Sequence, residues 1–330
     1  MDVTDDEVVL LSNIAVANKI VTALLFHIPN QEIVFSEDPE QEERSEDGII
    51  AFSWLHFLND PSSDAEYLLR LPMTKGAVKA MDTVQNFLTS DSAPEEIQDL
   101  NLSPAKFFVG GVSKRGWTTW TTASVDPRVI GILPVVMDDL NFVENMKHHY
   151  RSYGGWSFAL WDYWVLNITT YFGEPKMQEL CDIVDAFAYR EKMLMPKYVI
   201  NAANDEFFLP TDTRSTNVQH DELFQQIFSR YFWEQMPNYQ ELNRFILLPN
   251  AGHSCMAELS DLLPSVNAWL GNIIAADQAL VKVEKIDQLE TVDERNEYTQ
   301  RMTAAANVPR FTWTIDEESG DITVMSEVGR

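Results

Sequence analysis

The sequence predicts an α/β fold with a mainly parallel sheet, and three observations support this. Short apolar runs of strand length alternate along the chain with longer segments of helical spacing, an order typical of parallel strands joined by helices. The apolar runs are continuous rather than alternating, as expected for strands buried on both faces. The composition, 45% hydrophobic and 11% aromatic in 330 residues, is that of a chain with a packed core.

The first segments begin this alternation. Thr4 and Glu7 fit a capping box, which predicts a helix over 4–19. The run IVTALLFHI predicts a buried strand at 20–28. The acidic stretch at 36–48 predicts a solvated loop.

The rest of the chain continues the alternation around one long helical segment. Aromatic residues and helical spacing without a clear strand mark 139–195 as a helical insertion covering the sheet. A charged helical linker is predicted over 273–308, and the alternation in 309–330 predicts a hairpin that turns near Ser319. The other segments are predicted as helices at 49–58, 65–89, 116–124 and 259–270, and as strands at 106–110, 128–136, 197–202 and 244–249.

The charge balance narrows the classes of partner. With 24 basic and 51 acidic residues the net charge is -27, which repels phosphate backbones and anionic lipid, so nucleic acid and membrane surfaces are not expected partners. A neutral or cationic small molecule or peptide is favoured as a substrate. No stretch reaches the apolar length of a membrane span. The acidic start MDVTDDEVVLL lacks the basic residues of a secretory signal, so the chain as written is expected in the cytoplasm.

Three polar residues follow three of the predicted strands. Ser113 comes after FFVGG, Asp205 after KYVINA, and His253 after RFILLP. A serine hydroxyl becomes a useful nucleophile when an imidazole takes its proton and a carboxylate orients that imidazole. The chain order Ser, Asp, His at strand ends is that of α/β-hydrolases. The conjunction therefore predicts a catalytic triad on an α/β-hydrolase-type sheet.

Each residue of this set also has a simpler interpretation. Ser113 could be a serine in a glycine-softened turn, Asp205 a cap of the following segment, and His253 a hydrogen-bonded structural residue. The usual elbow has glycines two residues before and two after the nucleophile. Here Gly111 fits, whereas Arg115 occupies the second position and Gly116 comes one residue later.

The residues after Ser113 suggest further roles. The backbone N–H of Lys114 is the expected first donor of an oxyanion hole. The side chain of Lys114 either reinforces that donor or is held in an ion pair, and Arg115 suits a structural ion pair. Trp117 and Trp120, three residues apart on the expected helix, are best explained by packing.

The insertion contains the other candidate side chains. His148 and His149 are adjacent, so on a helix they point in different directions, and no further ligand stands at metal-binding spacing. We therefore expect no metal and no cofactor. Tyr153, Trp156 and Trp161 either line a substrate pocket or pack the core of the insertion. Cys181 and Cys255, the only cysteines, are expected as unpaired buried thiols.

Several long segments resemble one protein family in the same order. They are FHIPNQ, LRLPMTKGAVKAMDTVQNFL, GVSKRGWTTWTTASVDPRV, HHYRSYGGWS, MPKYVINAANDEFFLP and LPNAGHS. They are similar to the PhoPQ-activated pathogenicity-related family, which includes autocrine proliferation repressor proteins, over about 8–270. The resemblance implies an α/β-hydrolase domain, here 1–272, with Ser113, Asp205 and His253 as the triad. It also implies that the displaced glycine of Ser-Lys-Arg-Gly is a family trait.

The resemblance also implies that parts of the usual fold are missing. The sheet of α/β-hydrolases has strands before the helix that matches 4–19, and a loop there supplies the second oxyanion N–H. The chain is therefore expected to lack these N-terminal strands and that loop, and 309–330 to be the truncated start of a β-rich C-terminal region. Strand 20–28 should then pair directly with 106–110 or leave a gap. Family members often carry export signals, so a chain trimmed at its N-terminus would be a secreted one.

These observations predict a serine hydrolase, of esterase or peptidase type, that acts on an ester or amide through an acyl-enzyme. Two alternatives remain. One is a non-catalytic signalling protein with the same fold, resembling the proliferation repressors. The other is a truncated, inactive fragment.

Overall fold

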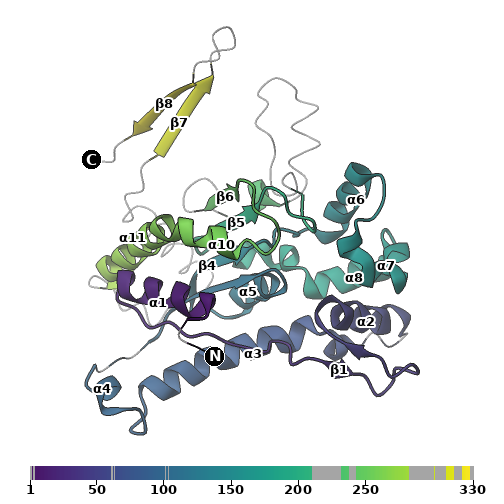
Figure 1. Cartoon of the computed structure of the whole chain (residues 1–330), viewed down its shortest axis with the longest axis horizontal. Coiled ribbons are helices and arrows are strands. Elements are labelled where there is room, and N and C mark those ends of the chain that lie inside the picture. The colour runs from purple at the N-terminus through teal and green to yellow at the C-terminus, as the bar shows by residue number, and fades with distance from the viewer. Residues whose placement is uncertain are drawn as a thin grey trace. The chain divides into compact units, whose positions relative to one another are not determined.

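The computed structural model describes most of the chain. The described residues are 2, 4–60, 62, 64–100, 102, 104–209, 232–237, 243–281, 301, 310–315 and 322–327. Most of the predicted linker at 273–308 and the predicted turn near Ser319 lie outside them. The chain divides into two compact units, Met1–Thr22 with Asp261–Arg330, and Ala23–Ser260 (Figure 1).

The unit that joins the two ends of the chain contains two packed helices and a hairpin. Helix α1 (Asp6–Asn18) contacts α11 (Leu263–Val281), and the Asn18 side-chain amide donates to Asn267 Oδ1 at 2.8 Å. The helix predicted at 4–19 is confirmed, but it follows Asp5 and no side chain caps it, so the predicted capping box does not form. Strands β7 (Arg310–Ile315) and β8 (Ile322–Glu327) pair antiparallel, which confirms the predicted hairpin.

The larger unit is built on one parallel sheet. Four of the five predicted strands are present and pair in the order β3 (Phe107–Val112), β4 (Val129–Val135), β5 (Tyr198–Ala202) and β6 (Arg244–Leu248). All residues of β5 are buried, as its continuous apolar run predicts. The parallel sheet and its helices confirm the predicted α/β fold class with a mainly parallel sheet.

The fifth predicted strand, at 20–28, does not form. These residues have no strand pairing, and the large side chains of Leu24, Leu25 and Phe26 are exposed. Among the described residues β3 pairs only with β4, so the other edge of β3 has no strand beside it. Of the two expected outcomes, direct pairing of 20–28 with 106–110 or a gap, the structure therefore has the gap. An apolar run becomes a strand only where a neighbour completes its hydrogen-bond ladder.

The acidic stretch at 36–48 is more structured than the predicted solvated loop. Short strands β1 (Ile33–Val34) and β2 (Glu43–Arg44) pair across it, and Asp38 and Arg44 form a buried ion pair at 2.9 Å. Its last residues begin helix α2 (Glu46–Asn59). The prediction holds for the exposed residues 39–43. It fails for Asp38 and Arg44, which pair within the stretch, and for Glu46, which pairs with Arg115.

Helices cover the sheet. Helix α5 (Lys114–Val125) contacts β3 and β4, and α3 (Arg70–Leu88) packs against α5. Trp117 and Trp120 are buried on α5; their indole N–H groups donate to Val184 O at 2.6 Å and Met137 O at 2.9 Å. The packing interpretation of both tryptophans is confirmed. Shorter helical segments are η1 (Ala65–Tyr67), α4 (Glu95–Gln98), η5 (Trp233–Gln235), α10 (Met256–Leu259) and η6 (Ser260–Leu262).

The segment between β4 and β5 is helical, as predicted. Its helices α6 (Phe142–Tyr153), α7 (Trp161–Val165) and α8 (Pro175–Val184) lie together (Figure 1), and α7 and α8 contact α2. Trp54 of α2 packs edge-on against Phe142 of the insertion at 5.1 Å between ring centroids, so the insertion shares the hydrophobic core of this unit. Its elements are α6 (Phe142–Tyr153), η2 (Phe158–Leu160), α7 (Trp161–Val165), η3 (Ile168–Tyr171), α8 (Pro175–Val184) and η4 (Ala186–Lys192).

Candidate active site

Ser113 occupies the turn between β3 and α5. Its backbone has φ 55° and ψ -123°, a region that non-glycine residues rarely enter and that costs about 1–3 kcal/mol. The turn is held on both sides, because the Ser113 N–H donates to Val135 O at 2.8 Å and the Trp117 N–H donates to Ser113 O at 3.1 Å. The strained turn presents the hydroxyl at the carboxyl end of the sheet.

The packing around Gly111 and Gly116 explains why the second glycine of the elbow is at position 116 and not at 115. A Cβ at Gly111 would lie 2.5 Å from the carbonyl oxygen of Arg115, and a Cβ at Gly116 would lie 2.5 Å from Cβ of Met137. The first turn of α5 therefore packs directly on β3 and on the residues after β4. Position 116 faces Met137, whereas Arg115 meets Gly111 with its backbone and Cβ and turns its guanidinium toward Glu46.

Gly116→Ala is therefore expected to destabilise the fold by about 1–3 kcal/mol, because the added methyl group overlaps a neighbour that cannot move freely. Gly155→Ala is the control, since a Cβ there meets nothing within 4 Å. Urea unfolding of both variants measures the difference. Equal free energies of unfolding for the two variants would show that the helix is not held this closely.

The loops after β5 and β6 bring the other two predicted residues to Ser113. The Nε2 atom of His253 lies 2.8 Å from Ser113 Oγ. Its Nδ1 atom lies 2.9 Å from Oδ2 and 3.0 Å from Oδ1 of Asp205. Asp205 is buried, and its Oδ1 also accepts the N–H groups of Phe207 at 2.8 Å and Phe208 at 3.0 Å. The carboxylate is thus oriented by the backbone that follows it.

Glu206 is a site residue that the sequence analysis missed. Its Oε2 accepts the backbone N–H of His253 at 3.1 Å, so it fixes the loop that carries the imidazole. Its carbonyl oxygen accepts from Ser157 Oγ at 3.3 Å, which joins the insertion to this loop. The ring of Phe207 lies 4.3 Å from that of His253 and covers one side of the imidazole. The only available signal was a second acidic residue next to Asp205.

The side chain of Lys114 is held in ion pairs, which is the second of its two predicted roles. Its ammonium lies 2.7 Å from Asp47 Oδ2 and 3.4 Å from Glu46 Oε2. Its backbone N–H is the first of α5 and belongs to the amides that have no partner within the helix. Arg115 makes a two-pronged pair with Glu46, with both N–O distances 2.6 Å. Burial alone would raise the pKa of Glu46, but hydrogen bonds from Arg115 and Gln31 lower it to about 2.

A buried arginine supports the same turn. Arg70 of α3 is fully enclosed; its Nη1 donates to Lys114 O at 3.0 Å. Its guanidinium lies 4.0 Å from the centre of the Trp117 ring, and such stacking suits a poorly hydrated cation. Burial lowers the pKa of Arg70 to about 10. Neither of its contacts has a sequence signal, because its partners lie more than forty positions away.

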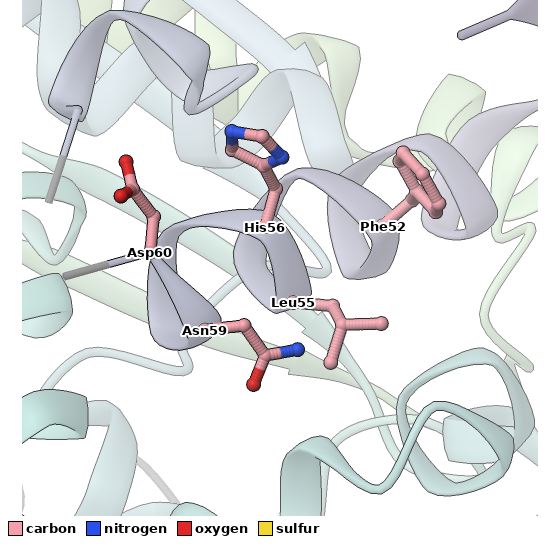
Figure 2. A pocket seen from close by; sticks show the side chains of 5 residues that line it. All are labelled: Phe52, Leu55, His56, Asn59 and Asp60. Atoms are coloured by element: carbon pink, nitrogen blue, oxygen red, sulfur yellow. The ribbon is translucent and has the colours of Figure 1, made fainter. Parts of the chain in front are cut away.

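The three predicted pocket residues differ in their exposure to solvent. Tyr153 and Trp161 are exposed, Trp161 by 60%, so neither packs in the core of the insertion. Trp156 is half-buried and packs within the insertion, with its ring 5.5 Å from that of Phe172. A shallow hollow of about 340 Å³ lies elsewhere, along α2 (Figure 2), and includes none of the candidate site residues. Its lining residues are Phe52, Leu55, His56, Asn59 and Asp60.

The histidines of α6 are integrated into the insertion. His149 is buried, and its Nε2 accepts the Ser157 N–H at 3.3 Å. Burial, followed by the charge of His148, lowers the pKa of His149 to about 4.

In the part of the chain that the structure describes, no three His, Cys, Asp or Glu side chains are grouped as metal ligands. Both cysteines are unpaired and buried. No described helix is long and apolar enough to cross a membrane.

Comparison with solved structures finds distant likenesses. An esterase of Pyrococcus furiosus matches with a TM-score of 0.33 and 14% identity, over 64% of this chain and 64% of that one. A puromycin-hydrolysing peptidase of Mycobacterium tuberculosis matches with a TM-score of 0.31 and 14% identity, over 54% of this chain and 24% of that one. At these scores the likenesses assign no activity.

Comparison of sequences is more specific. Autocrine proliferation repressor protein A of Dictyostelium discoideum is 39% identical over 254 residues, which make up 77% of this chain and 46% of that protein. The chain thus spans about half the length of this curated relative. The family model of the PhoPQ-activated pathogenicity-related protein matches residues 2–287. The chain therefore belongs to the PhoPQ-activated pathogenicity-related protein family.

Proposed function

We propose that the chain is a serine hydrolase that transfers an acyl group from an ester or amide to Ser113 and then to water. The observation that carries this proposal is the line of contacts from Ser113 Oγ to His253 Nε2, at 2.8 Å, and from His253 Nδ1 to Asp205, at 2.9 Å. This is the geometry that proton transfer from a serine requires. The strained backbone of Ser113 and the buried carboxylate of Asp205 support the same interpretation.

Each group has a defined role in the proposed reaction. Ser113 Oγ attacks the acyl carbonyl carbon while His253 Nε2 takes the hydroxyl proton. Asp205 accepts the Nδ1–H bond and stabilises the imidazolium that forms. The backbone N–H of Lys114 donates to the oxyanion. The imidazolium then returns its proton to the leaving oxygen or nitrogen, and a water molecule, deprotonated by His253, releases the acyl group as an acid.

A fluorophosphonate probe tests this proposal, because it phosphonylates activated serines. The wild-type chain should be labelled, and Ser113→Ala should not. Ser152→Ala is the matched control, since Ser152 is an exposed serine on α6 and its loss should leave labelling unchanged. Absence of labelling in a cooperatively folded wild-type chain would refute the proposal.

A second candidate is a non-catalytic signal that represses proliferation. It is favoured by the 39% identity to a protein named a proliferation repressor. A growth assay with purified protein separates the two. If the chain represses growth as a signal alone, Ser113→Ala will repress as strongly as wild type, whereas repression through hydrolysis will be lost in that variant.

A further inference from the structure

Phe207 is an aromatic residue that lies outside the described hydrophobic core. Its neighbour Phe208 packs against that core, whereas Phe207 is not among the described side chains that do so. Phe207 is half-buried, so part of it is accessible to solvent. Its backbone N–H donates to Asp205, but almost any residue could supply that group. The aromatic side chain at position 207 therefore needs another explanation.

A closed ring of contacts places Phe207 beside Ser113. Ser113 Oγ lies 2.8 Å from Nε2 of His253, and the centre of the imidazole lies 4.3 Å from the centre of the Phe207 ring. On its other side, the centre of the Phe207 ring lies 5.9 Å from the ammonium of Lys114, which directly follows Ser113 in the chain. The Phe207 ring thus reaches from the proposed base to the residue after the proposed nucleophile, and it borders the reaction site.

The imidazole determines which part of a substrate meets this ring. In the proposed reaction, His253 Nε2 takes the proton of the Ser113 hydroxyl and then gives it to the leaving oxygen or nitrogen. The leaving atom must therefore come within hydrogen-bond reach of the imidazole, about 3 Å. Because the Phe207 ring packs on that imidazole, tilted by 36°, a group attached to the leaving atom extends next to Phe207.

We propose that Phe207 is a specificity-determining residue that selects a planar aromatic leaving group, an aryl-bearing alcohol or amine. This inference rests on the proposed function. Aromatic rings with centres about 4.5–7 Å apart attract each other by more than the burial of their area. The Phe207 ring is already held by His253 and Lys114, so little freedom is lost when a second ring packs on it. A puckered ring of the same size gains only the burial.

Two acetate esters test this role. 2-Phenylethyl acetate and 2-cyclohexylethyl acetate have the same carbon skeleton, but only the first carries a planar ring. In wild type, kcat/KM should be about fivefold higher for the phenylethyl ester. In Phe207→Leu, which keeps an apolar side chain without a ring, the two values should be nearly equal. Since both esters use the same triad and acyl group, any disturbance of His253 changes both rates and leaves their ratio unchanged.

Two further variants serve as controls. Phe207→Tyr keeps the ring and should keep the wild-type ratio. Phe208→Leu is the matched control, since the ring of Phe208 lies 5.7 Å from that of His253 but packs against the core; whatever its effect on the two rates, it should also keep the ratio. Circular dichroism and thermal unfolding check that the variants are folded, and the wild-type ratio tests the inference even if Phe207→Leu does not fold.

The role of Phe207 would be contradicted by equal kcat/KM values for the two esters in wild type, by the wild-type ratio in folded Phe207→Leu, or by the same fall in Phe208→Leu. Fluorophosphonate labelling separates this inference from the proposed function. Absence of labelling on Ser113 refutes the hydrolase. Labelling with an unchanged ratio, or without hydrolysis of 2-phenylethyl acetate, refutes only the selection by Phe207.

Discussion

Replacing His253 by alanine is expected to slow fluorophosphonate labelling of Ser113 by about a thousandfold or more, since members of such a triad act as a unit. The physical reason is the 2.8 Å contact between His253 Nε2 and Ser113 Oγ. No other described side chain is hydrogen-bonded to that hydroxyl, so the serine would revert to the weak nucleophilicity of an alcohol. The second-order rate constant of labelling measures the effect.

A matched histidine controls for non-specific damage. His148 on α6 is half-buried and contacts Ser152 Oγ at 3.5 Å, away from the triad. His148→Ala should be labelled at the wild-type rate. If folded His253→Ala were labelled as fast as wild type, the imidazole would not be the base that activates Ser113.

Lys197 is expected to make the stability of the chain rise between pH 7 and pH 10.5. The side chain lies just before β5 and is fully buried. Its ammonium donates to the carbonyls of Met193 at 2.5 Å and Met195 at 2.9 Å. No carboxylate pairs with it in the described part of the chain, and burial lowers the pKa of Lys197 from 10.5 to about 7.

The sign follows from proton binding in the two states. Between pH 7 and pH 10.5 the unfolded chain holds a proton on Lys197 that the folded chain has released, so folding becomes more favourable as the pH rises. Lys197→Met removes this titration and keeps the length of the side chain. From pH 7 to pH 10.5, the free energy of unfolding of wild type should rise relative to that of Lys197→Met by up to about 5 kcal/mol.

Urea unfolding at several pH values measures this difference. The lost hydrogen bonds to Met193 and Met195 are the same at every pH, so the change with pH isolates the charge. Lys192→Met, at an exposed lysine, is the control and should follow wild type. If the free energies of unfolding of wild type and Lys197→Met differed by the same amount at every pH from 7 to 10.5, the buried amine would not titrate in this range.

The sheet and the set of three site residues could be predicted because their signals are local. A continuous apolar run identifies a buried strand, and the carboxyl ends of parallel strands meet at one edge of a sheet. Ser113, Asp205 and His253 each directly follow such a run, so order along the chain was sufficient to expect them together.

The supporting contacts could not be predicted because their partners are distant in sequence. Lys114 pairs with Asp47, 67 positions away, and nothing near Lys114 identifies that carboxylate. Glu206 acts through the backbone of His253, 47 positions away. A pairing of this kind depends on how loops meet, which residue type and spacing do not encode.

Two segments show where pattern reasoning reaches its limit. The apolar run at 20–28 has the composition of a buried strand, but a strand also needs a neighbour with free hydrogen-bonding groups. For Trp161, aromatic character indicated either a pocket wall or core packing, and its 60% exposure excludes the core. Its helix is held by Leu160 and Tyr163, and helical spacing alone could not say which positions would point inward.

Mass spectrometry of the labelled chain tests the central claim most directly. After reaction of wild-type protein with a fluorophosphonate and digestion, we expect one adduct, on Ser113 in the peptide that contains GGVSKRG. An unmodified Ser113 in folded protein, or an adduct on a different hydroxyl, would contradict the assignment of this serine as the nucleophile.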